Sequence, residues 1–334
     1  MKERKDNIDI LKGIGIILMV LGHMHFNDAV FNKYIFGFHM PLFFLVSGYL
    51  YHRPESFGKA VVKKAKTMLI PYYTFGMAYY FLWIIAVYDG ETHILSPLFS
   101  ILFKVTEGLP IESALWFLPV LMLTYFLYYA LERNISAISL RATAVLIITF
   151  SGCLVTEILY EHIFGGIGTA MSAIGFFFIG HMAAENKDKS VIINRIIGKW
   201  YVFVLLLILN TVMIFMNEKV NMRTGEWAVV PVSYINALLA TLLYCKISVW
   251  IAGKEIISRA VKYIGKNSIV FLCTNHLAII VSSKLLGFMH MEHGTVLYWI
   301  AVFIISMLEM IIATELINRT QLRIIIGKEF MSNR

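Results

Sequence analysis

The stretch LKGIGIILMVLGHMH, from Leu11 to His25, is an apolar run with a lysine near its start and two histidines at its end. Runs of about 17 to 25 apolar residues recur along the whole 334-residue chain, and no long polar stretch separates them. Apolar residues make up 59% of the chain, charged residues 15%, and the mean hydropathy is +0.73. Water could not cover so much apolar surface, so the composition excludes a soluble domain and predicts an integral membrane protein.

Ten segments have the length and hydropathy of membrane-spanning helices. Each is predicted to be helical, because backbone amides in lipid must be hydrogen-bonded within their own segment. The basic start of the chain resembles a signal peptide, but no small-residue cleavage site follows it, so we expect the first segment to be retained. A shorter apolar segment, 93–105, is predicted to be a partly inserted or surface helix. The predicted spans are 8–26, 34–52, 67–88, 113–132, 141–161, 168–184, 200–217, 230–250, 266–285 and 295–317.

The distribution of basic residues predicts the orientation. With the N-terminus inside, 24 of the 29 Lys and Arg residues lie on the inner side of the ten spans. The chain is therefore predicted to be one all-α domain, 1–334, a polytopic integral membrane bundle of about ten transmembrane helices with cytoplasmic tails at 1–7 and 318–334. The net charge of +8 reflects this topology, so we expect no nucleic-acid partner. The three cysteines lie in apolar segments without short spacings, which argues against a disulfide framework and a zinc site, and we expect no metal.

Ionisable groups at membrane depth are costly, so each is a functional candidate. Lys12 and His23 are 11 residues apart, which on a helix is about 20° from three full turns and ~16 Å of rise, so they share one face. Lys12 would lie near the cytoplasmic entrance and His23 in the outer half. Two structural alternatives stay open: Lys12 as an interfacial anchor, and His23 as a histidine hydrogen-bonded by a neighbouring helix. His25 is predicted to be interfacial.

The second and third spans add further candidates. His39 is predicted to lie near the outer end of its span, at a depth similar to that of His23. Pro41 and Ser47, with the glycine after Ser47, either kink the helix or let a neighbouring helix or a ligand come close. Lys63 and Lys66 lie one turn apart at the cytoplasmic start of the third span. Such a pair is either a topology signal that contacts lipid headgroups or a clamp for a phosphorylated ligand.

Later spans also carry polar or aromatic groups. Trp116 lies near the outer face, where an aromatic belt is expected in any case. Asn275 and His276 lie about halfway across the ninth span, where interhelical hydrogen bonding is the structural alternative to a functional role. Glu157 and Glu309 are buried-carboxylate candidates for which the sequence identifies no partner.

Five motifs occur in order along the chain: NIDILKGIGIILMVLGH, HMPLFFLVSGYL, KKAKTMLIPYY, LWFLPVL and YIGKNSIVFLCTNH. In this order and with this span count, the chain resembles the membrane-bound acyltransferase-3 family from about residue 7 to residue 280. Members of that family mostly transfer acetyl or other short acyl groups to sugars of cell-surface glycans. The resemblance implies a ten-helix bundle that takes acyl-coenzyme A from the cytoplasm and delivers the acyl group toward the outer side.

The resemblance also assigns expected roles. The family pattern of a basic residue followed by a histidine falls on Lys12 and His23. The Arg-x-x-Arg pair of the family falls on Lys63 and Lys66. Lysine keeps the positive charge but lacks the planar, forked guanidinium group of arginine. The Trp-Phe-Leu of the family begins at Trp116. We expect the three lysines to bind the donor.

Acyl transfer needs a base and oxyanion donors. We expect His23 to be the base, and His39 to hold His23, orient the acceptor or stabilise the oxyanion. Ser47, Asn275 and His276 are expected, with Trp116, to contact substrate. Direct transfer and a covalent acyl-histidine both stay open.

The function predicted from these residues is transfer of an acyl group, acetyl in the first instance, from acetyl-CoA to a hydroxyl of a cell-surface or lipid-linked glycan. The expected partners are membrane lipid, acyl-CoA and a glycan acceptor, and homo-oligomer formation stays open. A bacterial inner membrane location follows from the resemblance and from the short loops.

Two alternatives are a transporter or flippase, which an inverted repeat would favour, and a scaffold without chemistry. The two halves of the chain show no convincing internal similarity.

Overall fold

The regular structure is helical throughout the residues that the computed structural model describes, apart from one isolated bridge between Asn221 and Glu226. The described residues are 2–24, 29–88, 90, 93–106, 111, 114–159, 164–186, 199–217 and 220–329. The predicted interfacial residue His25 therefore lies outside them.

The helices follow one another along the described part of the chain. In order they are α1 (Lys2–His23), α2 (Ala29–Phe36), α3 (His39–Tyr49), α4 (Phe57–Lys64), a π-helical turn η1 (Ala65–Leu69), α5 (Ile70–Ala86), α6 (Ser96–Phe103), α7 (Phe117–Asn134), α8 (Ile138–Leu159), a short 3-10 turn η2 (Phe164–Gly166), α9 (Ile167–Glu185), α11 (Trp200–Met216), α12 (Val230–Ala252), α13 (Glu255–Lys266), α14 (Ser268–Phe288), α15 (Val296–Arg319) and a 3-10 helix η3 (Gln321–Ile326).

Several of these helices are long and apolar enough to cross a membrane, which makes the chain a multi-pass membrane protein. Helix α11 is apolar but shorter, whereas α1 and α7 coincide with predicted spans and include charged residues. The count of ten spans and the cytoplasmic position of both termini stay predictions. The seven long apolar segments are Val30–Tyr49, Phe57–Ala86, Ile138–Ile158, Ile167–Glu185, Val230–Ala252, Ser268–Phe288 and Val296–Arg319.

Two predicted spans differ in detail from the structure. The second is divided into α2 and α3, and α3 begins at His39, so Pro41 lies in its first turn, where a missing N–H breaks no helical hydrogen bond. The third begins earlier than predicted, at Phe57, and includes the π-helical turn η1. The expected short helix after it is present as α6.

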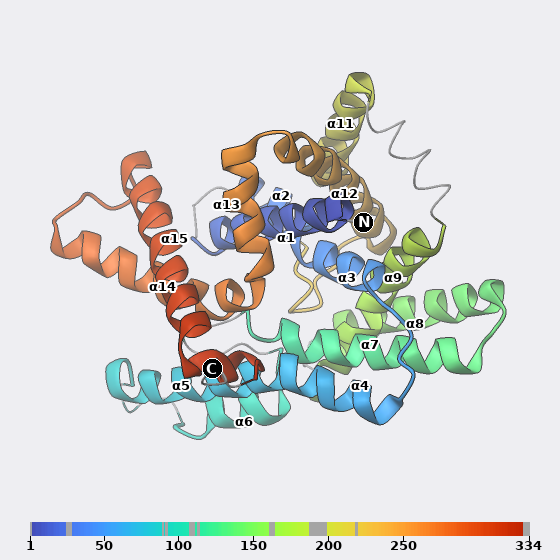
Figure 1. The fold of residues 1–334 in the computed structure, drawn as a ribbon, viewed down its shortest axis with the longest axis horizontal. Coiled ribbons are helices and arrows are strands. Elements are labelled where there is room, and N and C mark those ends of the chain that lie inside the picture. Colours follow the sequence, from blue (N-terminus) through green and yellow to red (C-terminus); the bar gives the residue numbers. More distant parts are fainter. Residues whose placement is uncertain are drawn as a thin grey trace.

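Helix α9 packs against α3, α7 and α8, and these helices form one side of the bundle (Figure 1). The contact between α3 and α9 is closest at two glycines. A methyl group at Gly48 would collide with the carbonyl oxygen of Phe177, and one at Gly180 would collide with that of Leu45. Small residues let helix backbones touch in this way within a membrane.

Helix α1 packs against α12 and α13 near the middle of the view in Figure 1. The sequence analysis assigns no span to residues 255–266, which form α13 alongside the first half of α1. Here again the backbones touch, because Gly13 faces the carbonyl of Val261 and Gly265 faces that of Asp9. The N-terminal half of α1 is thereby held between α12 and α13.

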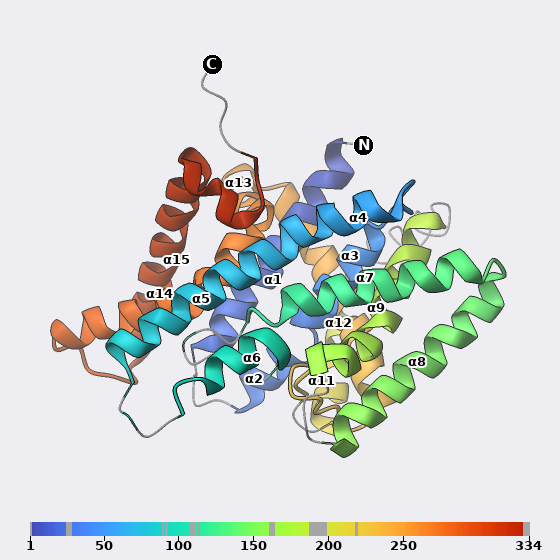
Figure 2. The same cartoon turned by 90° about the horizontal axis from the view of Figure 1, so that it is seen from below.

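Helices α14 and α15 pack together at the edge of the molecule opposite α8 (Figure 2). The outer face of α15 is an apolar stripe with a four-residue spacing, formed by Ile300, Ile304, Leu308, Ile312 and Leu316, each at least half exposed. Such a stripe on a long apolar helix matches a surface in contact with lipid tails.

Candidate active site

His23 is the last residue of α1 and faces the middle of α14. Its Nδ1 lies 2.7 Å from Oδ1 of Asn275, which is fully buried. The ring of His276 lies against the His23 ring in a tilted arrangement, with centroids 4.1 Å apart and planes inclined by 34°. The structure therefore brings together three of the predicted site residues from the two ends of the chain.

The Asn275 amide determines which nitrogen of His23 carries the proton. Its Nδ2 donates to the carbonyl of Leu272 at 2.7 Å, so its Oδ1 is the atom that faces His23. An oxygen accepts, and Nδ1 of His23 must then be the donor. This tautomer leaves a lone pair on Nε2, which is the form that a general base or a nucleophile requires.

Helix α14 is fixed next to this pair by a residue that the sequence analysis missed. The hydroxyl of Tyr79 on α5 donates to the carbonyl of Cys273 at 2.6 Å, and Tyr79 is buried. The bond lies two residues before Asn275, so it ties the backbone that carries the amide to the neighbouring helix. A lone tyrosine in an apolar span gives no signal of such a contact in the sequence.

His39 lies near His23 but is separated from it by an aromatic ring. The Phe36 centroid lies 6.4 Å from that of His23 and 5.3 Å from that of His39, which it meets edge to face. His39 is buried, and its Nδ1 donates to the carbonyl of Ile35 at 2.8 Å. Its Nε2 therefore also carries a lone pair, and the C-terminal end of α2 holds the ring in place.

Lys12 lies on the same unbroken helix as His23, so the predicted rise of ~16 Å between them holds for α1. Lys12 Nζ lies 3.8 Å from Oδ1 of Asp9, and both side chains are 22% exposed. The nearby carboxylate offsets part of the lysine charge, a pairing that the sequence analysis did not anticipate.

Lys63 and Lys66 are exposed, Lys63 at the end of α4 and Lys66 within η1. Among the described residues neither forms an ion pair. Figure 2 shows α4, the N-terminal half of α1 and the C-terminal end of α15 on the same side of the bundle. The predicted donor-binding lysines therefore lie at the end of the bundle remote from His23.

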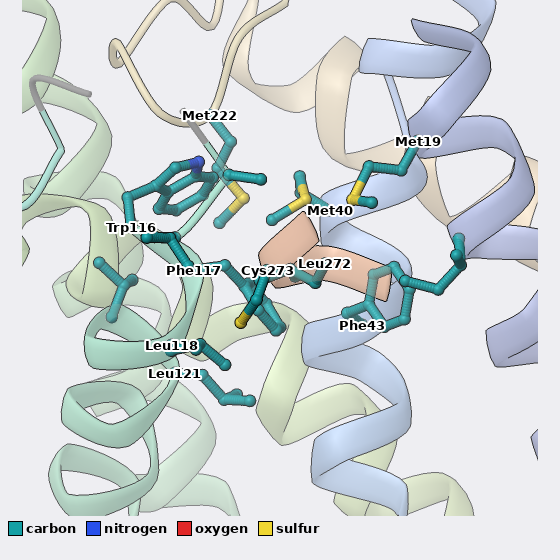
Figure 3. Packing of buried hydrophobic residues seen from close by; sticks show 14 of the residues in the cluster. Met19, Met40, Phe43, Trp116, Phe117, Leu118, Leu121, Met222, Leu272 and Cys273 are labelled. Atoms are coloured by element: carbon teal, nitrogen blue, oxygen red, sulfur yellow. The ribbon is translucent and has the colours of Figure 1, made fainter. Parts of the chain in front are cut away.

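Near His23 lies a buried cluster of sulfur-containing and aromatic side chains. Met19, one turn before His23 on α1, belongs to it together with Met40, Met222, Trp116 and Phe117, and Figure 3 shows them gathered around Leu272 and Cys273. Trp116 is only 5% exposed, and its ring meets that of Phe117 edge to face. Methionine side chains are flexible and adapt to the shape of a neighbour.

Met222 comes from a segment that the sequence analysis treats only as an outer loop. Its turn is closed by the bridge between Asn221 and Glu226, and Met222 and Trp227 are both buried. Nη1 of Arg223 donates to the carbonyl of Thr106 at 3.1 Å, and burial lowers the pKa of Arg223. Apolar residues inside a polar loop are the only sequence signal of this inward fold.

The remaining predicted residue, Ser47, is half-buried on α3, next to Gly48 and its contact with α9. Cys153 and Cys273 are buried free thiols. Among the described residues, no three His, Cys, Asp or Glu side chains are grouped as metal ligands would be.

The sequence of the chain is similar to known proteins. A family model described as an acyltransferase domain matches residues 5–315. The nodulation protein NolL of Sinorhizobium fredii (strain NBRC 101917 / NGR234) is 41% identical over 81 residues, which are 20% of this chain and 22% of the relative. The match thus spans about a fifth of the length of that relative. No solved structure matches the chain.

Proposed function

The chain belongs to the acyltransferase domain family, and from this premise we propose that it transfers an acetyl group from acetyl-CoA to a hydroxyl of a cell-surface or lipid-linked glycan. We further propose that it works in a bacterial inner membrane, taking the donor from the cytoplasm and the acceptor from the outer side. The single observation that carries the proposal is the hydrogen bond between His23 and Asn275, which makes Nδ1 the donor and so puts the basic lone pair of the imidazole on Nε2.

In the proposed reaction, Nε2 of His23 takes the proton of the acceptor hydroxyl as the hydroxyl oxygen attacks the thioester carbonyl. The tetrahedral intermediate collapses, the carbon–sulfur bond breaks, and the leaving thiolate takes the proton back from the imidazolium. Asn275 Oδ1 accepts from Nδ1 throughout and stabilises the positive charge that forms on His23. His276 lies against the reacting ring, where it can donate to the oxyanion. His39, beyond Phe36, carries a lone pair on Nε2 and would orient the acceptor by accepting from one of its hydroxyls.

The donor would bind at the opposite end of α1. Lys63 and Lys66 form no ion pair among the described residues, so their charge is available to the phosphates of coenzyme A, whereas Lys12 shares its charge with Asp9. An extended pantetheine arm bridges the ~16 Å from Lys12 to His23. On this path it would displace Met19 and Met40, whose side chains rearrange more easily than branched ones.

We assign Trp116 and Ser47 to substrate contacts along the same path. Trp116 offers an aromatic face next to Met222 (Figure 3), and sugars and acyl chains both pack on such faces. Ser47 offers a hydroxyl on α3, at a half-buried position. These two assignments rest on their place in the bundle.

The test is transfer of label from radiolabelled acetyl-CoA to crude surface glycan by the purified full chain in lipid nanodiscs. We expect transfer by the wild type, loss of at least a hundredfold in His23→Ala, and no change in His293→Ala, a matched exposed histidine in the connection between α14 and α15. No transfer by the wild type with acetyl, propionyl and longer donors would refute the acyltransferase proposal. Undiminished transfer by His23→Ala would remove His23 from the mechanism.

A further inference from the structure

After α15 ends at Arg319, the chain folds back on itself. The family match ends at residue 315, so the segment that folds back lies outside it. This C-terminal segment, residues 321–329, consists of η3 and the residues that follow it, and it packs against η1 and α5. Gly327 has φ of 73° and lies so close to Lys66 that a methyl group there would collide with the Lys66 carbonyl oxygen. Only glycine fits both the backbone angle and the contact.

The segment is anchored at several points. Thr320 accepts from the amide of Leu322 at 3.2 Å and so begins η3, and Ile326 is 5% exposed. Lys328 Nζ donates to Oδ1 of Asn318 at 2.6 Å, and Asn318 Nδ2 donates to Oδ1 of Asn267 at 3.0 Å.

These bonds connect the segment to α1. Asn267 follows directly after α13, whose Gly265 packs on the backbone of Asp9. A continuous series of contacts therefore runs from the neighbourhood of Lys12, through Asn267 and the C-terminal segment, to Lys66. The Lys12 end of α1 and the Lys63–Lys66 turn belong to one end of the bundle.

This fold gathers positive charge. Arg323 and Lys328 are joined by a backbone hydrogen bond of 3.1 Å, and they stand on the segment that covers the turn carrying Lys63 and Lys66. Burial lowers the pKa of Lys328, and the charge of Arg323 lowers it further. Among the described residues none of these four cations forms an ion pair. The like charges of Arg323 and Lys328 are unfavourable together, and an anion bound between them and Lys66 would offset that cost.

Arg323 also has an unused donor. Its Nε is enclosed by protein atoms and has no hydrogen-bond partner among the described residues. A guanidinium presents its donors as a planar fork that matches the oxygens of a phosphate, which lysine cannot do. The turn before α5 offers only lysines, so Arg323 supplies a planar guanidinium next to a turn that has none.

We propose that Arg323, supported by Lys328, binds a phosphate of coenzyme A opposite Lys63 and Lys66, so that the C-terminal segment completes the donor site. The inference rests on the proposed function, because it takes the donor to be an acyl-CoA. It adds a binding residue outside the region that the family model covers.

The experiment measures equilibrium binding of coenzyme A to the purified full chain in an uncharged detergent. We expect Arg323→Gln to raise the Kd by about tenfold or more, Arg323→Lys to give a smaller rise, and Lys328→Gln a rise of a few fold. The control is Arg259→Gln on α13, an exposed arginine paired with Glu255 near the same end, which should leave the Kd unchanged.

The outcomes separate the two proposals. A wild type that binds coenzyme A and transfers label, with Arg323→Gln binding as tightly as Arg259→Gln, overturns the role of Arg323 and leaves the acyltransferase proposal standing. A wild type that does not bind coenzyme A overturns both.

Lipid headgroups are the other source of phosphate, so a parallel arm uses nanodiscs of phosphatidylglycerol. If the anionic lipid raises the Tm only when Arg323 is present, while coenzyme A binds all variants equally, Arg323 binds lipid and the proposal is wrong.

Discussion

Replacing Asn275 by alanine gives the sharpest test of the site, because this side chain contacts His23 without reaching the donor end of the bundle. Asn275→Ala removes the acceptor for Nδ1 of His23 and the donor to the Leu272 carbonyl. The imidazole then loses its fixed tautomer, and the positive charge that forms during proton transfer loses a partner. We expect kcat to fall and the KM for acetyl-CoA to stay the same.

The size of the effect follows from the burial of the pair. Asn275 is fully buried and the His23 ring is half-buried, so water would replace the lost acceptor only in part. An unsatisfied buried donor costs roughly 1 to 3 kcal/mol, and about 1.36 kcal/mol corresponds to a tenfold change in rate. The expected loss in kcat is therefore about 5- to 150-fold. Asn275→Asp restores an acceptor at the same position and should lose less activity than Asn275→Ala.

The assay is the transfer of labelled acetyl groups at saturating donor and acceptor, with the Tm measured on the same preparations. Asn210→Ala is the matched control, because Asn210 is a buried amide on α11 whose Nδ2 donates to Oδ1 of Asn236 at 2.7 Å. It should lower the Tm by a similar amount and leave kcat within twofold. If Asn275→Ala lowers the Tm as Asn210→Ala does and keeps the wild-type kcat, the amide only holds the helices together and the catalytic argument is wrong.

Three further predictions concern other parts of the bundle. Lys63→Gln combined with Lys66→Gln should raise the KM for acetyl-CoA about tenfold and leave kcat unchanged; a fall in kcat alone would contradict donor binding by this turn. In the wild type kcat should decline as the pH falls from about 8 to about 5, because a protonated His23 has no lone pair, and a flat profile would argue against an imidazole base. Gly48→Val should lower the Tm by several degrees or prevent folding, since its side chain would overlap the Phe177 carbonyl, whereas Gly58→Val, at an open position on α4, should not.

The local part of the site could be predicted from the sequence. The 11-residue spacing of Lys12 and His23 fixes their common face once α1 is a continuous helix, which it is. Asn275 and His276 stand out as polar groups within an apolar helix. Their contact with His23 could not be predicted, because it joins residues 252 positions apart and depends on how α14 packs against α1 and α5.

Other features depend on tertiary contacts that leave a weak trace in the sequence. The break before His39 is consistent with Pro41, but the sequence does not say that the helix begins anew there rather than kinks. The inward fold of Met222 and the return of the C-terminal segment to Lys66 occur in stretches that hydropathy assigns to a loop and a tail. From the sequence Arg323 is only an inner-side charge, because a single arginine after the last span gives no spacing to interpret.

The glycine contacts between α3 and α9 constrain how the protein can move. The carbonyl oxygens of Leu45 and Phe177 lie where the Cβ atoms of larger residues would stand in place of the two glycines. If either helix slid along the other, these oxygens would meet neighbouring side chains and collide with them. For the proposed reaction this means that the acetyl group travels on the flexible arm of its carrier while α3 and α9 keep their positions relative to each other. Such an enzyme needs no cycle of inward-open and outward-open forms, and its turnover should depend on arm length more than on the stiffness of the bundle.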